Sequence, residues 1–477
     1  MSATNPQIEF PCRGVPQDAG LARLIGLYPQ RQDGPQSAPT CRACGPLWMQ
    51  RLKALGGRLS AGQWRALAEI VGYLTPDTPL HLTTRQDVEL HDLPAQAVPE
   101  AHRLLAAGGM TGLGACGDTL RNITVCPCSG ALAGSVDLFP LAWDVRNALE
   151  SQAGIFALPR KFKMAFCCSQ ACGQPWINDL AFLARREATG WGFRVIGAGS
   201  LGAAPATGIE LLDRLPPGDA VPLALAAVRL FAAHGDREHR SRARLRHVRQ
   251  RVGDGEFLAM LQETFAAVKA EREWASQDVR QAGPQLPASL PMTFANGDVT
   301  PDAARDLADL IERDGLEVRI ANNHQVVAFG RSQAEIRRAL ASSGPLAAAA
   351  APQPAVVACP GAHWCSRALT DTNRLADALR DRLRGHALSG LTVCISGCPN
   401  GCAHSRVADV GLVGVRATLD GQSTDAYDLF AHGGMGRTPD LSQPVARKLS
   451  AGQAISEVAK LAEQFGESQA AGRHRAD

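Results

Sequence analysis

The chain has 477 residues, of which 45% are hydrophobic and 20% are charged, and its formal net charge is +3. These values are ordinary for a soluble globular protein of about two to four domains, and the small net charge gives no reason to expect a nucleic-acid partner. The N-terminal residues lack a basic region followed by an apolar core, and no apolar run is long enough to span a membrane. We therefore expect a cytoplasmic enzyme with no membrane partner.

Residues 1–44 are rich in Pro, Gly and Gln and show no periodicity, so we expect an irregular N-terminal extension. This segment contains Cys41 and Cys44, a lone C-x2-C pair. Without a second pair at zinc spacing, such a pair is weak evidence for a metal.

Residues 45–115 are predicted to form a ferredoxin-like half-unit. Ser60 precedes an apolar pattern that is typical of a capped amphipathic helix. Residues 80–90 alternate between apolar and polar side chains, as a strand does. A second helix is predicted over 99–107.

Residues 116–280 are predicted to form an α+β domain. Strands are expected over 123–126, 158–166 and 193–196, because these segments are short, apolar and bounded by turn residues. The pattern over 217–280 is helical and includes a basic run.

Four cations of this first half are candidates for an anion pocket: Arg85, Arg121, Lys161 and Lys163. Isolated surface cations are the default interpretation of Arg and Lys. However, Lys161 and Lys163 point to the same side of a predicted strand, and Arg85 and Arg121 lie in polar, turn-rich segments. Converging cations would bind a small oxyanion and could supply protons as oxygen leaves as water.

Gly197, Gly199 and Gly202 form a G-x-G-x-x-G motif directly after a predicted strand, which is the dinucleotide-binding fingerprint. Pro205 follows closely and no helix begins at the third glycine, so the context that the fingerprint needs is missing. Close approach of this backbone to a flat or carboxylate-rich cofactor stays open.

Two further segments are predicted linkers: residues 281–300 are rich in Pro, Gly and Asn, and residues 345–354 form an alanine–proline tract. They border a second ferredoxin-like half-unit over 290–344. A second α+β domain is predicted over 355–470.

The 14 cysteines are too few for a disulfide scaffold in a chain of this length, and their clustering favours metal or redox chemistry. Cys359 and Cys365 form a C-x5-C pair, and Cys398 and Cys402 form a C-x3-C pair in the sequence CPNGC. Four thiolates on two short loops suit a [4Fe–4S] cluster, in which each iron takes one protein ligand. Zinc is a rival interpretation, although its structural sites favour closer pairs, and free buried cysteines are a third.

An internal repeat relates the two halves of the chain. The sequence CSQAC, which ends at Cys172, is followed after seven residues by Asp179 and an apolar run; CPNGC, which ends at Cys402, is followed at the same distance by Asp409 and a similar run. The predicted strand and helix of the first half-unit also have a counterpart in the second. We therefore predict an α+β fold of two pseudo-repeated modules, of which only the second carries four cysteines at cluster spacing.

With these motifs together, the chain resembles the siroheme-containing nitrite and sulfite reductase family over residues 45–470. The motifs that carry the resemblance are TTRQ at 83–86, GDTLRN at 117–122, LPRKFK at 158–163, CPGAHWC and CPNGC. The resemblance implies that Cys359, Cys365, Cys398 and Cys402 hold a [4Fe–4S] cluster, and that Cys402 also ligates the siroheme iron. The domains over 116–280 and 355–470 would then bind siroheme between them.

The resemblance also assigns the remaining site residues. It implies that Arg85, Arg121, Lys161 and Lys163 surround the substrate anion, with both arginines beside the siroheme as well. The other siroheme contacts that it implies are Arg160, Asn400, Gly197, Gly199 and Gly202.

The implied reaction is the six-electron reduction of sulfite to sulfide or of nitrite to ammonia. In relatives that favour nitrite, the second lysine of the K-x-K pair tends to be asparagine, whereas this chain has Lys163. Because sulfite carries more negative charge than nitrite, we expect sulfite as the main substrate and nitrite as a second one. No flavin or NADPH motif is evident, so the expected electron donor is a ferredoxin or a separate flavoprotein subunit.

Three alternative functions stay open: an assimilatory nitrite reductase, a precorrin-3B synthase-like monooxygenase of the same superfamily, and a non-catalytic iron–sulfur electron carrier. An inorganic-anion pocket argues against the last two. The chain also has extra cysteines, which most simply pack as small apolar side chains. These are Cys167, Cys168, Cys172 and Cys394.

Overall fold

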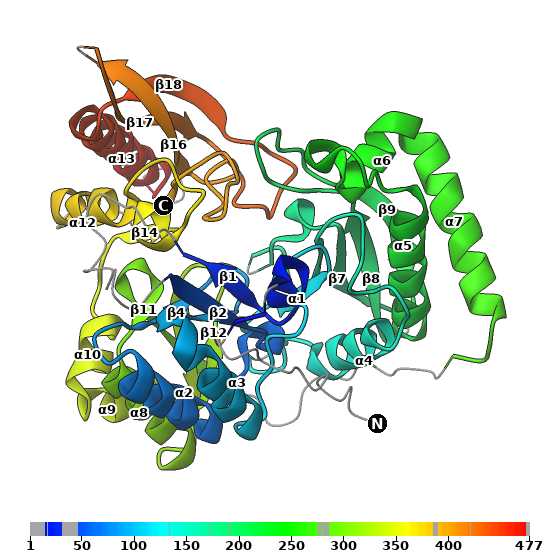
Figure 1. Cartoon of the computed structure of the whole chain (residues 1–477), viewed down its shortest axis with the longest axis horizontal. Coiled ribbons are helices and arrows are strands. Elements are labelled where there is room, and N and C mark those ends of the chain that lie inside the picture. Colours follow the sequence, from blue (N-terminus) through cyan, green and yellow to red (C-terminus); the bar gives the residue numbers. More distant parts are fainter. Residues whose placement is uncertain are drawn as a thin grey trace.

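The computed structural model of the chain describes residues 15–16, 18–30, 46–132, 134–171, 173–188, 190–274, 279, 286–384, 390–419 and 421–473. Cys41, Cys44 and Cys172 lie outside these residues. Within the described ranges, no helix is both long and apolar enough to cross a membrane. Figure 1 shows three parts: the paired half-units, and two α+β domains that each contain their own sheet.

The two half-units have the same order of elements, strand–helix–strand–strand–helix. Their strands also pair in the same antiparallel order, with the last strand in the middle. Half-unit 1 contains β2 (Leu47–Leu52), α2 (Ala61–Leu74), β3 (Leu80–Leu82), β4 (Val88–Pro94) and α3 (Val98–Ala107). Half-unit 2 contains β10 (Ala288–Thr293), α8 (Pro301–Glu312), β12 (Glu317–Ile320), β13 (Gln325–Gly330) and α9 (Gln333–Ala341).

The two half-units share one hydrophobic core. Helix α2 starts with a capping box: Ser60 Oγ accepts the N–H of Gln63 at 3.2 Å, and Gln63 Oε1 accepts the N–H of Ser60 at 3.0 Å. Its buried face, which includes Trp64 and Leu67, packs against α8. Strand β11 (Asp298–Val299) then pairs with β3, so a strand of the second half extends the sheet of the first.

The two α+β domains, called copy 1 (116–280) and copy 2 (355–470) below, contain five-stranded sheets of identical topology. In each, the first three strands pair in parallel, and the fourth strand pairs antiparallel with both the third and the fifth. Copy 1 has β5 (Leu120–Val125), β6 (Phe162–Cys167), β7 (Leu180–Glu187), β8 (Gly190–Gly197) and β9 (Ile209–Leu215). Copy 2 has β14 (Ala355–Ala358), β15 (Thr392–Ser396), β16 (Val410–Leu419), β17 (Gln422–Ala431) and β18 (Gln443–Leu449). This topology confirms the predicted repeat.

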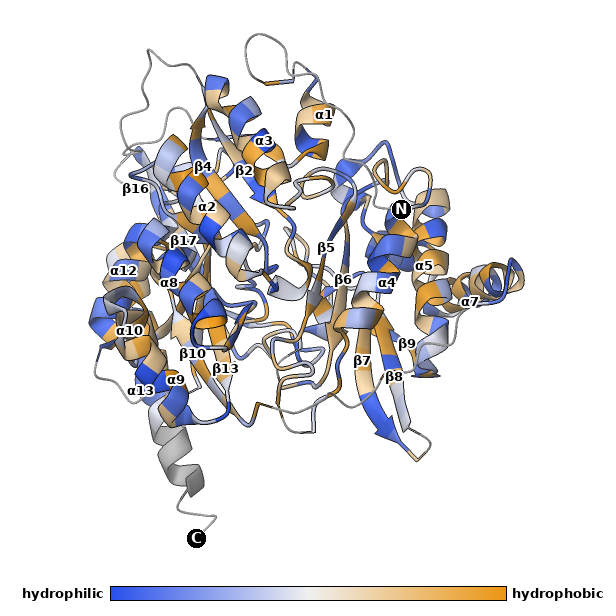
Figure 2. Cartoon of the chain, turned by 90° about the horizontal axis from the view of Figure 1, so that it is seen from below, coloured by the Kyte–Doolittle hydropathy of each residue, from blue (hydrophilic) through white to orange (hydrophobic). Residues whose placement is uncertain are grey.

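Helices cover both sheets. Those of copy 1 are α4 (Phe139–Glu150), α5 (Ala220–His234), α6 (Leu245–Val252) and α7 (Asp254–Ala270). Those of copy 2 are α11 (Gly361–Trp364), α12 (Thr372–Leu383) and α13 (Ala451–Arg473). In Figure 2, α5 is largely hydrophobic, and β7 is hydrophobic along its buried half and hydrophilic at its exposed end. Helix α5 therefore packs against β7 and shares the hydrophobic core of copy 1.

One carboxylate fixes the start of the second strand in both copies. Asp179 Oδ2 accepts the backbone N–H of Lys163 at 2.8 Å, and Asp409 Oδ2 accepts the backbone N–H of Thr392 at 3.0 Å. The aspartates that follow CSQAC and CPNGC in the sequence thus accept the corresponding backbone hydrogen bond in both sheets.

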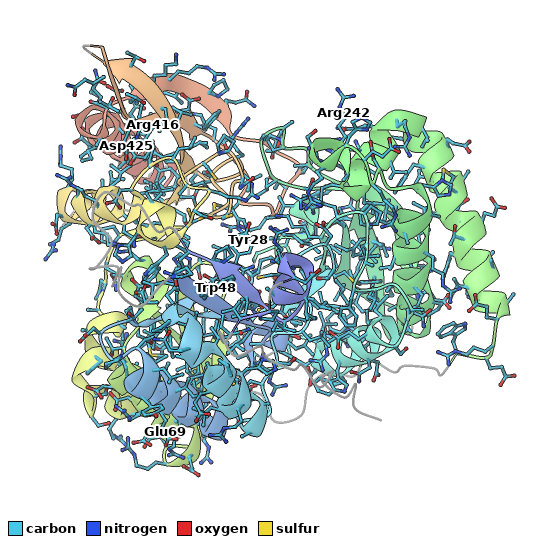
Figure 3. The ribbon with its side chains drawn as sticks, viewed as in Figure 1. Tyr28, Trp48, Glu69, Arg242, Arg416 and Asp425 are labelled. Carbon is cyan, nitrogen blue, oxygen red and sulfur yellow. The ribbon has the colours of Figure 1, made fainter. Side chains whose placement is uncertain are left out.

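The N-terminal segment is more ordered than predicted. Within the described part of 1–44, helix α1 (Ala19–Leu24) leads to β1 (Leu27–Pro29), which pairs with β2. Tyr28, labelled in Figure 3, accepts a hydrogen bond from Arg367 Nε at 3.1 Å. The order of this segment was not predicted because its sequence lacks a periodic pattern. The segment is held instead by pairing with β2 and by contact with copy 2.

Three local predictions are wrong. Residues 80–90 are not one strand, because residues 83–87 form a turn between β3 and β4, with Gln86 at φ 61°. The predicted linker at 281–300 contains β10. The alanine–proline tract forms α10 (Gly344–Ala350), because Ser343 caps it and proline is well tolerated in a first helical turn.

Candidate active site

The four cysteines predicted to bind a cluster lie on two loops that follow neighbouring strands of copy 2. Cys359 directly follows β14, and its N–H donates to the carbonyl of Ile395 at 3.0 Å. Cys365 ends the short helix α11, and Cys398 and Cys402 lie on the loop after β15. Because β14 and β15 are parallel, both loops leave the same edge of the sheet.

The four thiols lie close enough together for the charge of one to shift the pKa of another. Burial is the main cause that raises the pKa of Cys359 and of Cys365, and it raises the pKa of Cys398 to about 11; the neighbouring thiols, Cys402 among them, add to the rise. Backbone N–H groups oppose it, including that of Gly397, which donates to Cys359 Sγ at 3.2 Å. Such donors stabilise bound thiolates.

These thiols are not arranged as ligands of one ion. Among the described residues, no group of three or more His, Cys, Asp and Glu side chains is gathered as a single metal ion requires. The ligands of a [4Fe–4S] cluster instead bind four separate irons, so their sulfurs stand apart. Four cysteine thiols on two loops, without a histidine, are a donor set that fits a [4Fe–4S] cluster, which takes one thiolate at each iron.

Arg85 lies in the turn between β3 and β4 and reaches into copy 1. Its Nη1 donates to Asn178 Oδ1 at 3.1 Å, and its Nη2 donates to the carbonyls of Asn122 at 2.7 Å and Met164 at 3.2 Å. Burial lowers its pKa to about 10. Its Nε is buried and has no hydrogen-bond partner within the described chain, so one donor is left for a bound group.

Lys161 and Lys163 are half-buried at the start of β6. Burial lowers the pKa of Lys161 to about 7 and the pKa of Lys163 well below its usual range, and nearby cations add to both shifts. The charge of Cys402 acts on both ammonium groups and opposes these shifts. Neither ammonium group has a hydrogen bond or an ion pair with a described residue. Unpaired cations that are half removed from water favour binding of an anion.

Arg121 completes the set of predicted cations. It lies on β5, and its Nη1 donates to the carbonyl of Gly117 at 3.1 Å. Burial is the main cause that lowers its pKa, and the repulsion of Arg51 acts in the same direction. Its charge also lowers the pKa of Arg85 and of Lys161, so the cations predicted from separate motifs act on one another.

The site is assembled from both copies and a half-unit. Thr84, next to Arg85, donates its hydroxyl to the carbonyl of Cys402 at 2.7 Å. On the other side, a Cβ built on Gly401 would lie 3.6 Å from the Cβ of Leu201 and 3.7 Å from the N of Gly202. The glycine loop of copy 1 therefore faces the loop CPNGC of copy 2.

Two of the three glycines of that loop allow close packing. A Cβ on Gly199 would stand 2.2 Å from the carbonyl oxygen of Trp176, and a Cβ on Gly197 would stand 2.5 Å from Leu211 Cδ1. Gly202, with φ 139°, has open space where a Cβ would lie. The loop ends without a helix, as the sequence predicts.

The two other predicted siroheme contacts are placed differently. Arg160 pairs with Asp118 at 2.8 Å, and Arg240 pairs with the same carboxylate at 2.7 Å. Asn400 makes hydrogen bonds to the thiol of Cys398 through its backbone and its side chain. In this structure Asn400 thus orients Cys398, one of the cysteines predicted to bind the cluster, and the charge of Arg160 is already balanced by Asp118.

Sequence reasoning missed several residues that build the pocket. Arg244 Nη2 lies 2.6 Å from Asp179 Oδ2, and its charge lowers the pKa of Lys161 and Lys163. Arg246 Nε donates to Ser200 Oγ at 2.7 Å and so holds the glycine loop. Both arginines belong to the basic run near α6, but no local signal separates these buried arginines from their exposed neighbours.

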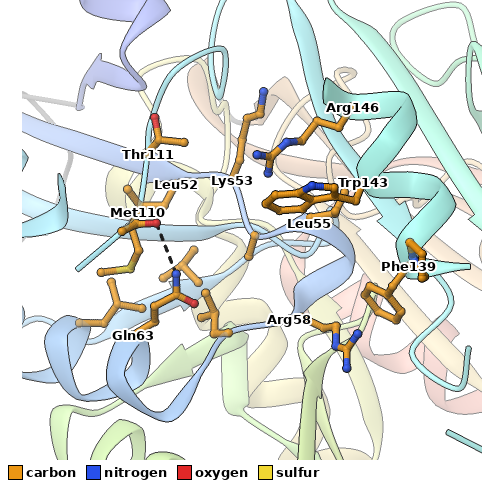
Figure 4. A pocket seen from close by; sticks show the side chains of 16 residues that line it. Leu52, Lys53, Leu55, Arg58, Gln63, Met110, Thr111, Phe139, Trp143 and Arg146 are labelled. Atoms are coloured by element: carbon orange, nitrogen blue, oxygen red, sulfur yellow. Dashed lines mark hydrogen bonds between the residues drawn. The ribbon is translucent and has the colours of Figure 1, made fainter. Parts of the chain in front are cut away.

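A separate cavity of about 440 Å³ lies between half-unit 1 and α4 (Figure 4). Lys53, Arg58, Trp143 and Arg146 are among its lining residues, whereas the four predicted cluster cysteines and the four predicted cations are not. Glu150 pairs with both Lys53 and Arg146, and Glu317 pairs with Arg58. These three cations of the cavity are therefore paired, and the cavity is separate from the predicted anion site.

Comparisons with known proteins identify the domains of the chain. A family model described as the nitrite and sulphite reductase 4Fe-4S domain matches residues 116–269 and 353–476. A second one, the nitrite/sulfite reductase ferredoxin-like half domain, matches residues 44–108.

Similar proteins include reductases of both anions. The assimilatory ferredoxin-dependent nitrite reductase of Haloferax mediterranei is 30% identical over 89% of this chain and 80% of its own length. A ferredoxin–nitrite reductase of Synechococcus elongatus is 29% identical, covering 83% and 82%. The sulfite reductase [NADPH] hemoprotein beta-component of Acidithiobacillus ferrooxidans is 26% identical, covering 87% and 82%. The solved structure of the Mycobacterium tuberculosis NirA protein has the same fold, with a TM-score of 0.79 and 23% identity over 93% of this chain and 86% of that one.

Proposed function

The chain belongs to the nitrite and sulphite reductase family, and from this premise we propose that it reduces nitrite to ammonia with electrons from a ferredoxin. It is an oxidoreductase whose cofactors are siroheme and a [4Fe–4S] cluster. One observation carries the assignment of an inorganic-anion substrate: Lys161 and Lys163 are half-buried near the charge of Cys402 and have no partner among the described residues.

The residues present fit both cofactors. We propose that Cys359, Cys365, Cys398 and Cys402 hold the cluster and that the sulfur of Cys402 also binds the siroheme iron. When bound, these groups supply the electrons of the reduction. The protein's own part is to hold the anion, place its oxygens and deliver protons.

The cations divide this work. Arg85 has a free buried N–H, and its other donors are fixed by Asn178 and by backbone carbonyls, so its guanidinium is held in one orientation. Arg121 and Lys163 offer further charge-assisted hydrogen bonds to the oxygens. Lys161, whose pKa is about 7, is suited to donate a proton near neutral pH as an oxygen leaves as water.

Nitrite is preferred here because the similar proteins of highest identity above are named as nitrite reductases. Sulfite is the second candidate, and one observation favours it: the second lysine, Lys163, adds a positive charge to the pocket, which suits a dianion better than a monoanion. Relatives of both kinds support the reduction of a small oxyanion in either case.

The electron donor and the cellular location are also proposals. Ferredoxin appears in the names of the nitrite reductases from Haloferax and Synechococcus, which supports a ferredoxin here. A separate flavoprotein subunit is the alternative, since another relative is named as an NADPH-dependent hemoprotein component. A cytoplasmic location stays a prediction.

The test measures both products with one donor. Protein purified without air is given reduced ferredoxin and either nitrite or sulfite, and ammonia and sulfide are quantified. We expect both products, with the higher kcat/KM for nitrite. A higher kcat/KM for sulfite would replace nitrite by sulfite as the main substrate. Absence of both products, with siroheme bound, would contradict the reductase assignment and favour the monooxygenase or the carrier.

A further inference from the structure

A second group of thiols lies in copy 1, at the position that holds the cluster cysteines in copy 2. Cys126 directly follows β5, as Cys359 directly follows β14. The N–H of Cys126 donates to the carbonyl of Phe166 at 3.0 Å, and the N–H of Cys359 donates to the carbonyl of Ile395 at 3.0 Å. Cys126 and Cys359 therefore occupy the same place in the repeat.

The hydrogen bond to the sulfur is repeated as well. The N–H of Cys168 donates to Cys126 Sγ at 3.3 Å, and the N–H of Gly397 donates to Cys359 Sγ at 3.2 Å. The hydrogen bonds of the strand ends therefore place Cys168 at the position of Gly397, one residue before Cys398, with which the spacing of CSQAC and CPNGC aligns it. The repeat thus explains how the loop after β5 and the loop after β6 come together, and the shift of one residue places the thiol of Cys168 on the copy 1 side of this hydrogen bond.

The thiol of Cys168 has a partner. Cys128 Sγ lies 3.1 Å from Cys168 Sγ, across the ends of two adjacent strands. A disulfide needs sulfurs about 2.05 Å apart, so a small rotation of the two side chains would bring these into bonding distance. Cys128 and Cys168 are half-buried, whereas Cys126 and Cys167 are buried. Of these four, only Cys128 and Cys168 are open to a small reagent.

We propose that Cys128 and Cys168 form a reversible disulfide, and that hydroperoxides are the oxidants. One thiolate attacks the outer oxygen of the hydroperoxide, the O–O bond breaks, and the inner oxygen leaves as hydroxide or alkoxide and takes up a proton, which gives water or an alcohol. The resulting sulfenic acid is attacked by the second thiol, which forms the S–S bond and releases water. With hydrogen peroxide, two thiols lose two electrons and two protons in total, and the peroxide becomes two waters. A dithiol reductant reverses the step by exchange.

The bridge would tie together two strands that carry substrate cations. It spans 40 positions in sequence and links the residues that follow the carboxyl ends of β5 and β6. Arg121 lies on β5 and Lys163 on β6, near the amino end of each strand. A link of this length restricts the unfolded chain, so the oxidised protein is expected to melt a few degrees higher.

The test uses the holoenzyme and mass spectrometry. Protein is treated with hydrogen peroxide, its remaining thiols are alkylated, and it is digested without reductant. We expect a peptide pair that joins Cys128 to Cys168, and its loss after dithiothreitol. C128S and C168S should abolish the pair, while C167A, which removes the buried neighbouring thiol, should keep it.

Two measurements keep the proposal falsifiable if a variant folds poorly. In the wild-type protein, alkylation of Cys128 and Cys168 should disappear on oxidation and return on reduction. A bridge from Cys168 to Cys172 or to Cys126, or unchanged labelling, would overturn the proposal. Binding of zinc or iron by these thiols would also overturn the proposal. It would appear as metal in the wild-type protein beyond the iron of the cluster and siroheme, and this extra metal would be missing from C128S.

Discussion

The sheets of copy 1 and copy 2 have the same strand order, the same aspartate at the second strand and the same hydrogen bond to a cysteine sulfur, yet they use opposite ends. Copy 2 presents Cys359 and Cys398 at the carboxyl ends of its first two strands. Copy 1 presents Arg121 and Lys163 at the amino ends of the corresponding strands. The two copies thus share one scaffold, and each places its proposed site residues at a different edge of its sheet.

The largest expected effect comes from the junction of the two copies. Cys402→Ser removes a proposed ligand of both cofactors, so we expect loss of the siroheme absorption of the native protein and of activity. Cys394→Ala is the matched control, because Cys394 is buried in β15 of the same copy; it should keep the spectrum and the activity. An unchanged spectrum in Cys402→Ser would remove Cys402 from the site.

The shared aspartate should matter unequally in the two copies. Asp179 is buried and also pairs with Arg244, so Asp179→Ala leaves a buried charge unpaired and should cost about 3–5 kcal/mol of unfolding free energy. Asp409 accepts the corresponding backbone N–H but forms no ion pair with another described residue, so Asp409→Ala should cost only about 1–3 kcal/mol. Denaturant unfolding measures both, and equal losses would contradict the special role of the Asp179–Arg244 pair.

Substrate choice should respond to a cation of copy 1. Lys163→Asn removes one positive charge, so kcat/KM should fall about tenfold to a hundredfold more for sulfite than for nitrite. Steady-state kinetics on both anions provides the measurement. Lys460→Ala, which changes an exposed lysine on α13, is the control and should change neither value. Equal losses on both substrates would show that Lys163 does not discriminate between them.

The smallest effect is a dependence on pH. Since the pKa of Lys161 is lowered to about 7, its ammonium group loses its proton as the pH rises through that value, and the KM for nitrite should rise. The charged groups that act on it are Arg121, Arg160, Arg244, Lys163 and Cys402. In Lys161→Arg the charge persists at higher pH, so the rise should disappear. The same pH profile in both proteins would exclude Lys161 as its source.

Much of this architecture is predictable from the sequence because its signals are local. The four cysteines stand in two short motifs, and the aspartate at a fixed distance from each CxxxC sequence reveals the repeat. The helix after Ser60 follows from its cap and its apolar face. Such features need no knowledge of distant residues.

What the sequence does not reveal depends on partners far along the chain. The strand β1 forms because β2 lies beside it, and the buried position of Arg244 follows from Asp179, 65 positions earlier. The turn at 83–87 consists of five polar residues, TTRQD, between two short alternating segments, and the prediction carried one strand across them. The partner of Cys168 is likewise set by the parallel pairing of β5 and β6.

The hydrogen bond from Thr84 to Cys402 joins residues 318 positions apart. During synthesis the N-terminal half-unit therefore leaves the ribosome long before the loop that completes its pocket. Contacts between such distant segments form late and slowly in folding. The anion pocket and the cluster loop can consequently become one site only after residue 402 has been synthesised, which sets the earliest moment at which both cofactors can be secured together.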